Sequence, residues 1–315
     1  MSTVFLHQLK DFDQLLRVIG EERGIDPSLV EKDYWIMHAL YGLSAQGYDY
    51  VLKGGTSLSK GHRIIHRFSE DIDIYIRPAP GYGISENSLS RGQAARRRSF
   101  YDSLATAIRI PGFVEVERDY SFDDELHYRS GGIRLKYESR TGLLEGLKEG
   151  ILLEVGFDTV TPNERFDIGS WAYERAVQSG ASVIDNQATA VACYHPGYTF
   201  VEKLQAVATK YRKERESGVT NPNFMRQYYD LYCLLDHSGV IGFIGTQEYL
   251  EHKRKRFPRK DLEVPIHANE AFLLSDPAIR EAYTDRYHRT SGLYYQGQPP
   301  FEDVMDRIRF FLARL

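Results

Sequence analysis

The sequence predicts an α+β protein with two domains: a strand-and-helix domain over residues 1–190, and a helical domain over residues 191–315 that closes an active-site cleft. Three observations support this prediction. The 315 residues suffice for two hydrophobic cores. Short strand-like runs alternate with helical patterns up to about residue 190. Beyond that point the apolar residues recur at helical spacing.

Two helices are expected before the first strand. Apolar residues at helical spacing predict the first helix within residues 5–19. Asp26 and Pro27 have the residue types preferred at the N-cap and N1 positions, so they predict the start of the second helix. A short apolar strand then leads into a Gly54-Gly55 turn, and another strand carries Asp71 and Asp73.

The rest of the chain continues this change from strands to helices. An arginine-bearing helix is expected over residues 91–109. Three strands then follow, beginning near Phe113, Gly132 and Ile151. In the second domain, Thr199 and Glu202 have the spacing of a capping box at the head of a helix. Further helices are expected over residues 224–237 and 303–315.

The composition predicts a soluble protein of the cytoplasm with no membrane partner. Apolar residues make up 42% of the chain and charged residues 27%, and no apolar stretch approaches the length of a membrane span. The N-terminus lacks the pattern of a signal peptide. Cys193 and Cys233 lie far apart without a CxxC motif, which argues against a disulfide framework and against structural zinc.

The net charge of −4 excludes a uniformly basic coat for nucleic acid. Basic residues nevertheless gather in three segments, at residues 91–98, 209–215 and 252–260. Such local patches fit an RNA acceptor that is bound through its phosphates. The alternative is that each segment is a solvated helix face.

Asp71 and Asp73 are the clearest candidates for chemistry. They alternate with Ile72 and Ile74, so both carboxylates should project from one face of the strand. Two carboxylates roughly 7 Å apart along a strand repel each other unless a cation lies between them. Mg²⁺ prefers a few carboxylate oxygens together with phosphate oxygens and waters. We therefore expect Mg²⁺ as the cofactor and a nucleoside triphosphate as the substrate.

A third carboxylate is needed to complete such a metal site, and Glu154 is the candidate. It lies in an otherwise apolar strand, where an unpaired glutamate would be costly. The alternative is a glutamate that faces solvent on a half-exposed strand. Asp158 lies on the same face of that strand and is the substitute, and Glu202 is a further possible carboxylate.

The turn after the first strand is the candidate phosphate-binding element. Glycines at 54 and 55 allow the backbone to approach a phosphate chain closely. The N–H groups of Thr56 and Ser57 are then expected to meet its negative charge.

Cations are also required for the triphosphate and for the leaving pyrophosphate. The candidates are Lys53, Lys60, Arg67 and Lys203. Arg67 has an alternative role as the partner of Glu70, while Lys60 and Lys203 have the alternative of a solvated surface. Asp230 lies among apolar and aromatic residues. It either orients Lys203 or Arg226, or is a satisfied buried carboxylate.

Several of these motifs together resemble the AbiEii/AbiGii-type nucleotidyltransferases, the toxin halves of type IV toxin–antitoxin and phage-defence modules. The strings are KGGTSLSK at 53–60, RFSEDIDI at 67–74, EKDYW at 31–35, LLEVG at 152–156, TFVEKL at 199–204 and RQYYDL at 226–231. The resemblance spans about residues 28–236. It implies a DNA polymerase β-like nucleotidyltransferase domain with a mixed sheet, dependence on Mg²⁺, and use of a nucleoside triphosphate. For some members it implies addition of nucleotides to the 3′ end of tRNA, which stops translation.

The resemblance also assigns residues by position. Gly54, Gly55 and Ser57 match the turn that cradles the triphosphate, and Asp71 and Asp73 match the metal pair. The three remaining matches are Glu154 for the carboxylate of the following strand, and Lys203 and Asp230 for the motifs of the helical domain. Many relatives carry a lysine just before the Glu154-type carboxylate, where this chain has Leu152.

The resulting hypothesis is a toxin that transfers a nucleotide to an RNA 3′ end, with tRNA as the expected acceptor and a cognate antitoxin, such as a helix-turn-helix protein, as partner. One alternative is transfer to a small molecule or a protein side chain. Another is a non-catalytic module that binds nucleotide or antitoxin. Ser69 lies two residues before Asp71, so its phosphorylation should add negative charge beside the metal site and inhibit transfer.

Overall fold

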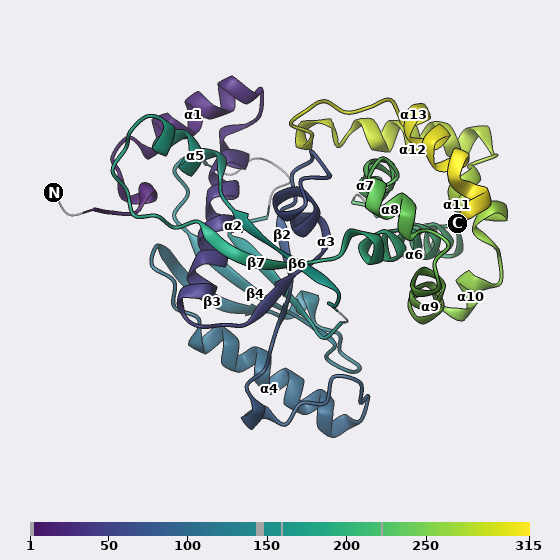
Figure 1. Ribbon diagram of the computed structural model, residues 1–315, viewed down its shortest axis with the longest axis horizontal. Coiled ribbons are helices and arrows are strands. Elements are labelled where there is room, and N and C mark those ends of the chain that lie inside the picture. Colours follow the sequence, from purple (N-terminus) through teal and green to yellow (C-terminus); the bar gives the residue numbers. More distant parts are fainter. Residues whose placement is uncertain (1–2, 143–147, 159, 222) are drawn as a thin grey trace. The chain divides into compact units, whose positions relative to one another are not determined.

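The computed structural model describes residues 3–142, 148–158, 160–221 and 223–315 (Figure 1). Residues 1–62 and 68–194 form one compact unit, here called the sheet unit. Residues 63–67 and 195–315 form a second, here called the helical unit. The short segment 63–67 therefore belongs to the helical unit, although in the sequence it lies between two parts of the sheet unit, just before the strand that carries Asp71 and Asp73.

The sheet unit is built on a seven-stranded mixed sheet with the order β3-β4-β5-β2-β1-β7-β6. The strands are β1 (Tyr50–Leu52), β2 (Asp71–Ile76), β3 (Phe113–Asp119), β4 (Ser130–Tyr137), β5 (Ile151–Gly156), β6 (Asn163–Ile168) and β7 (Ala188–Tyr194). The pairs β1–β7 and β2–β5 are parallel, and the other four pairs are antiparallel. The predicted α+β class and mixed sheet are confirmed.

Two strands were not predicted from the sequence. Strand β6 reads NERFDI, which lacks a clean alternation of apolar and polar residues, and it lies at the edge of the sheet. Strand β7 reads ATAVACY, and three of its seven residues are alanine, which is depleted in strands. Its position between β1 and β6 supplies the pairing that its local sequence does not indicate.

Helices surround this sheet. They are α1 (Phe12–Arg23), α2 (Pro27–Ala45), α3 (Gly54–Thr56), α4 (Arg91–Ala107) and α5 (Trp171–Gln178). Asp26 caps α2 by accepting a hydrogen bond from the backbone N–H of Ser28 at 2.8 Å, so the predicted start is confirmed. The first helix was predicted too early, because the backbone is extended at Leu9 and separates a short turn from α1.

Helix α2 contacts strands β5 and β7. Figure 1 shows it crossing the sheet. Its residues are buried around most of its circumference. Its sequence is unusual for such a helix, because Glu31, Lys32 and Asp33 are all no more than 2% exposed. Buried charges require partners. Glu31 accepts hydrogen bonds from the segment 139–141, including the N–H of Arg140 at 2.8 Å. The charged residues of α2 therefore fix loops around the sheet.

The helical unit contains eight helices within the described residues. They are α6 (Pro196–Ser217), α7 (Arg226–Leu234), α8 (Ser238–Phe243), α9 (Gln247–Arg256), α10 (Arg259–Leu262), α11 (Glu270–Leu273), α12 (Pro277–His288) and α13 (Phe301–Phe311). The capping box predicted at Thr199 is wrong. Helix α6 begins at Pro196, and the His195 ring accepts the capping hydrogen bond from Gly197 N–H at 3.1 Å. Pro196 favours this start because a helix N1 position needs no N–H donor.

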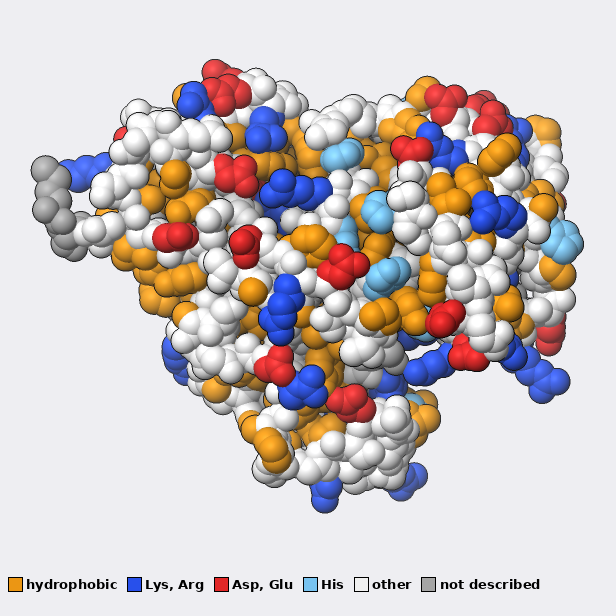
Figure 2. Space-filling model, viewed as in Figure 1, with side chains coloured by type: hydrophobic (Ala, Val, Ile, Leu, Met, Phe, Trp, Pro, Cys, Tyr) orange, Lys and Arg blue, Asp and Glu red, His pale blue; other side chains and the backbone are white. Residues whose placement is uncertain are grey.

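The charge distribution, the hydropathy of the helices and the state of the two cysteines can be compared with what the sequence predicts. Figure 2 shows acidic and basic side chains interspersed over one face of the molecule rather than a single basic area. Among the described residues, no helix has both the length and the hydropathy that a bilayer span requires. Cys193 and Cys233 are both free thiols.

Candidate active site

Strand β2 presents two carboxylates on one face. Asp71 and Asp73 are half-buried, whereas Ile72 and Ile74 are fully buried, which is the predicted alternation. The Asp71 carboxylate accepts a hydrogen bond from Lys148 Nζ at 2.8 Å. A cation is therefore already paired with one of these two acids.

Glu154 on β5 joins this face. In the parallel β2–β5 register it lies directly opposite Asp73, while Leu152 lies opposite Asp71. Every other residue of β5 is buried, and Glu154 is half-buried. Burial, followed by the negative charge of Asp73, raises the pKa of Glu154 to about 7, although Lys53 and Lys148 oppose the rise. A cation placed between these acids would relieve their mutual repulsion.

A glycine turn packs directly against these acids. Gly54 has φ = +65°, a conformation that favours glycine. A Cβ atom at this position would lie 1.9 Å from Asp73 Oδ2. The Lys53 N–H donates to Asp73 O at 2.8 Å, and the Thr56 hydroxyl donates to Asp71 O at 2.7 Å. The turn and β2 are therefore bonded together at both aspartates.

The hydroxyl groups of this turn are internal. The side chains of Thr56 and Ser57 are no more than 1% exposed, and Gly55 is buried as well. The Ser57 N–H donates to Lys53 O at 3.4 Å, within the turn. The expected contact of the Gly54, Gly55, Thr56 and Ser57 backbone with phosphate stays a prediction.

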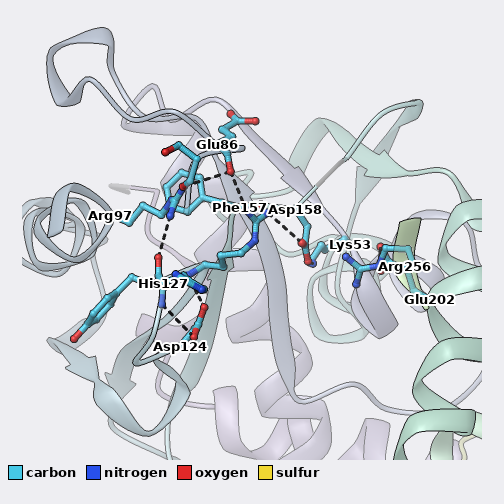
Figure 3. A network of polar contacts seen from close by, with 12 residues as sticks. Lys53, Glu86, Arg97, Asp124, His127, Phe157, Asp158, Glu202 and Arg256 are labelled. Carbon is cyan, nitrogen blue, oxygen red and sulfur yellow. Dashed lines mark hydrogen bonds and ion pairs between the residues drawn. The ribbon is translucent and has the colours of Figure 1, made fainter. Parts of the chain in front are cut away.

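Lys53 extends from the same turn toward Asp158. Its Nζ lies 2.9 Å from Asp158 Oδ2, and Arg129 lies 3.6 Å from the other carboxylate oxygen (Figure 3). Asp158, the substitute metal ligand of the sequence analysis, is therefore a partner of two cations. Lys53 is also close enough to Glu154 for its positive charge to lower the pKa of that carboxyl.

Lys148 is a site residue that the sequence analysis missed. Its backbone is fixed from two sides: Lys32 Nζ donates to Lys148 O at 2.5 Å, and Lys148 N–H donates to Glu70 at 3.3 Å. Its side chain then reaches Asp71. One signal in the sequence could have indicated it. Many relatives carry a lysine where this chain has Leu152, and Lys148 lies only four residues before that position.

Lys60, a candidate for the triphosphate, has a structural role. It forms an ion pair with the buried Asp33 and donates to Gly169 O at 3.2 Å. Asp33 also accepts a hydrogen bond from Trp171 N–H at 2.9 Å, at the start of α5. Lys60 therefore joins the segment that follows the glycine turn to α2 and α5.

A second polar cluster lies within the helical unit. Asp230 on α7 is fully buried and accepts two hydrogen bonds from Arg67, each at 2.7 Å. Lys203 on α6 contacts the same carboxylate at 2.8 Å. These two cations hold the pKa of Asp230 below its usual value although burial opposes this. Asp230 therefore orients Lys203, one of the roles considered from the sequence, and it also binds Arg67.

Glu202 also lies in the helical unit. It pairs with Arg256 of α9, with Arg256 Nε 3.6 Å from its carboxylate. His252, also on α9, lies 3.9 Å from the same carboxylate oxygen. Glu202 therefore has basic partners of its own on α9.

The acids of the sheet unit suit Mg²⁺ without enclosing it. Among the described residues, no three His, Cys, Asp or Glu side chains are grouped closely enough to hold a metal ion by themselves. Mg²⁺ rarely occupies an all-protein cage and usually takes one or two carboxylates plus phosphates and waters. An open face with Asp71, Asp73 and Glu154 fits this chemistry.

Comparison with known proteins gives the family. A search of curated proteins found no match. A solved nucleotidyltransferase-like antigenic protein from Paracoccidioides brasiliensis is 12% identical over 80% of this chain and 92% of its own, with a TM-score of 0.40. The family model described as "Nucleotidyl transferase AbiEii toxin, Type IV TA system" matches residues 36–307. The chain therefore belongs to the AbiEii nucleotidyl transferase toxin family of type IV toxin–antitoxin systems, and it is a nucleotidyltransferase.

Proposed function

We propose that this nucleotidyltransferase moves a nucleoside monophosphate from a nucleoside triphosphate to the 3′ end of an RNA, with tRNA as the acceptor class, and that the reaction depends on Mg²⁺. Family membership implies a nucleotide substrate and an antitoxin partner. The observation that carries the proposal is the grouping of Asp71, Asp73 and Glu154 on one face of β2 and β5, against the Gly54 turn. A DNA polymerase β-like arrangement of the sheet unit is part of this proposal.

Asp71, Asp73 and Glu154 are the residues that would hold Mg²⁺. When bound, Mg²⁺ would supply positive charge that neutralises the triphosphate and the negative charge that develops on the phosphoryl and leaving-group oxygens. Lys53 and Lys148 bring two further cations to the same acids. The missing side chain at Gly54 lets Asp73 lie directly against the turn, so that the turn and the acids form one surface. Lys203, oriented by Asp230, is the additional candidate for the triphosphate.

The transfer itself is a displacement at the α-phosphorus. The oxygen of the RNA 3′-hydroxyl forms a bond to this phosphorus, and the bond from phosphorus to the pyrophosphate oxygen breaks. The hydroxyl proton must leave during this exchange. Glu154 is the candidate to accept this proton if Asp71 and Asp73 alone hold the metal, because burial beside Asp73 raises the pKa of the metal-free carboxyl to about 7. Pyrophosphate leaves with the electron pair of the broken bond, and its negative charge would be neutralised by Lys53 and Lys148.

The RNA acceptor draws support from exposed basic residues in the helical unit. Arg254, Arg259 and Lys260 are exposed at the end of α9 and in α10. Other members of the basic segments have internal roles. Arg97 is fully buried and donates to the carbonyl groups of His127 and Ser85 (Figure 3). The exposed residues around α10 are the candidates for phosphate contacts that we test, although Arg91, Arg96, Arg98, Lys213 and Arg215 are exposed as well.

The test is transfer of α-labelled ATP, CTP, GTP and UTP to total tRNA in Mg²⁺, with wild type, Asp71→Asn and the control Asp49→Asn. Asp49 is exposed, and its ion pair with Arg77 lies at the surface. We expect label on tRNA with wild type and Asp49→Asn, and none with Asp71→Asn or with EDTA. Transfer by Asp71→Asn would refute the site. Pyrophosphate release without labelled tRNA would refute the tRNA acceptor while leaving the enzyme in place.

The acceptor can be tested separately by reversing the charges of Arg254, Arg259 and Lys260. Removing a cation that binds an RNA phosphate should weaken tRNA binding and reduce its dependence on salt. We expect a higher KM for tRNA and an unchanged KM for the nucleotide. Arg17→Glu, at an exposed position of α1, is the control. An unchanged KM for tRNA would favour a small-molecule or protein acceptor.

A further inference from the structure

A cavity of about 460 Å³ lies in the helical unit, here called the α7–α13 pocket. Its walls come from the segment 64–66, from α7, from residues 296–299, and from Arg307 on α13. All of these residues except Ile64 and His66 lie within the continuous stretch 195–315, and those two belong to the same compact unit. A volume of several hundred cubic ångströms is typical of small-molecule sites in proteins.

Hydrogen bonds hold the walls of the pocket together. The His66 N–H donates to the Tyr229 hydroxyl at 3.2 Å, and the Tyr295 N–H donates to His66 O at 3.1 Å. The Gln298 amide donates to Tyr287 O at 2.8 Å. These bonds join the segment 64–66, α7 and the 296–299 segment into a preformed site.

The chemistry of the lining favours a planar, uncharged ligand. The Arg307 guanidinium lies 3.9 Å from the centre of the Tyr232 ring, and one of its nitrogens lies 3.4 Å from the Asp236 carboxylate. One positive and one negative group therefore offset each other. Burial lowers the pKa of His66, so this imidazole is neutral near pH 7. A phosphate group would require an excess of positive charge, which this lining lacks.

A nucleobase matches the groups that remain. Its flat face can stack on a guanidinium or aromatic plane, as bases do on arginine and tyrosine in single-stranded recognition. Its edge carries donors and acceptors, which the exposed side-chain amide of Gln296 can complement.

The pocket and the Asp230 cluster are built from neighbouring residues of the chain. Tyr229 lines the pocket and precedes Asp230, which binds Arg67 and Lys203. His66 lines the pocket and precedes Arg67. The same two chain segments therefore carry an uncharged base-sized pocket and a pair of cations suited to phosphate.

We propose that the α7–α13 pocket binds a nucleobase, either that of the incoming nucleoside triphosphate or that of the last nucleotide of the acceptor. This inference rests on the proposed nucleotidyl transfer, because the transfer supplies both sources of the base. Tyr232 and Arg307 provide the stacking surface, and Gln296 contacts the edge of the base.

The first test is binding without turnover. Adenosine, cytidine, guanosine and uridine are titrated into the full chain without Mg²⁺ and followed by ligand-observed NMR. We expect at least one nucleoside to bind and its affinity to fall about tenfold in Arg307→Ala and in Gln296→Ala. Gln296 is exposed, so its replacement leaves the fold intact. Arg314→Ala is the matched control, because Arg314 lies over the Phe311 ring outside the pocket.

This binding measurement does not require nucleotidyl transfer, since nucleosides carry no phosphate and no product is formed. Its failure can therefore be distinguished from failure of the proposed function. Failure of every nucleoside to bind, or equal binding by wild type and both pocket variants, would overturn the proposal. In steady-state transfer, a higher KM for the nucleotide in Gln296→Ala assigns the pocket to the incoming base. A higher KM for the acceptor assigns it to the terminal base. Unchanged KM values for both would also overturn it, and would leave the pocket to another partner such as the antitoxin.

Discussion

Gly54 and Asp73 are in such close contact that a Cβ atom on Gly54 would lie 1.9 Å from Asp73 Oδ2. Glycine is required here for two reasons. A side chain would collide with Asp73, and the backbone angle φ of +65° disfavours any residue that has a side chain. The first strand, its turn and the acidic strand are bonded into one element by the Lys53 N–H and the Thr56 hydroxyl. The position of Asp73 therefore depends on a residue that has no functional group.

Gly54→Ala should abolish transfer, because the added methyl group must displace Asp73 or the turn. The backbone strain alone should cost about 1–2 kcal/mol of the free energy of unfolding. Gly47→Ala separates the two effects, since Gly47 has φ = +79° and nothing within 4 Å of an added Cβ. Chemical unfolding and tRNA labelling of both variants are the measurements. Full transfer by Gly54→Ala would show that the Asp73 position is not critical.

Lys148→Met should tighten binding of a divalent cation severalfold, because Lys148 Nζ competes for the Asp71 carboxylate. The measurement is a Mn²⁺ titration followed by electron paramagnetic resonance, which needs no turnover. Lys136→Met is the control, since Lys136 pairs with Glu115 and Glu117 on the neighbouring β3. Weaker Mn²⁺ binding by Lys148→Met would mean that Lys148 supports the cation site rather than opposing it.

The structural features of the two units differ in how far they could be predicted from the sequence. The alternation around Asp71 and the cap at Asp26 depend on neighbours in the chain, so local patterns reveal them. The Lys148–Asp71 contact joins residues 77 positions apart, and the Arg67–Asp230 contact joins residues 163 apart. Only the order of strands and the packing of helices creates such pairs, so the sequence identified Arg67 and Asp230 without linking them.

Strand β7 illustrates the same limit for the fold. Its alanine-rich sequence has no strong local preference, and parallel pairing with β1 places it inside the sheet. Glu154 shows the opposite case. An acid in an apolar strand was a visible signal, and the β2–β5 register places it opposite Asp73. A residue that conflicts with its surroundings was therefore found, whereas pairings between distant residues, such as Lys148 with Asp71, were missed.

His7 should make the sheet unit less stable as the pH falls. Burial, with the nearby His38, lowers its pKa from 6.5 to about 4. The unfolded chain therefore binds the proton more tightly, and stability is complete above about pH 6.5 and declines toward pH 4. At about 1.4 kcal/mol per pKa unit, the decrease is about 3 kcal/mol. Chemical unfolding at pH 7.5, 5.5 and 4 measures it.

His7→Asn is the variant that isolates this effect. Asparagine can keep a hydrogen bond to the Tyr34 hydroxyl, which His7 Nδ1 makes at 2.9 Å, but it does not titrate. The acids of the chain titrate in both proteins, so the difference between their pH profiles belongs to His7. Identical profiles for wild type and variant would exclude His7 as the source.

Asp230→Ala and Lys203→Met should separate stability from chemistry in the helical unit. Removing Asp230 leaves Arg67, which is 3% exposed, without its bidentate partner. Removal of one member of a buried ion pair costs about 3–5 kcal/mol. Lys203→Met leaves the Arg67–Asp230 pair in place, so unfolding should change far less.

If Lys203 serves the triphosphate, Lys203→Met should lower kcat/KM for the nucleotide at least tenfold while the protein stays folded. Lys213→Met, at an exposed position of the same helix, is the control. The measurements are chemical unfolding and steady-state transfer for all three variants. Normal transfer by Lys203→Met would leave Lys203 as one of two countercharges for a buried acid. Because Asp230→Ala weakens both properties at once, only the lysine variant distinguishes a phosphate-binding role from a structural one.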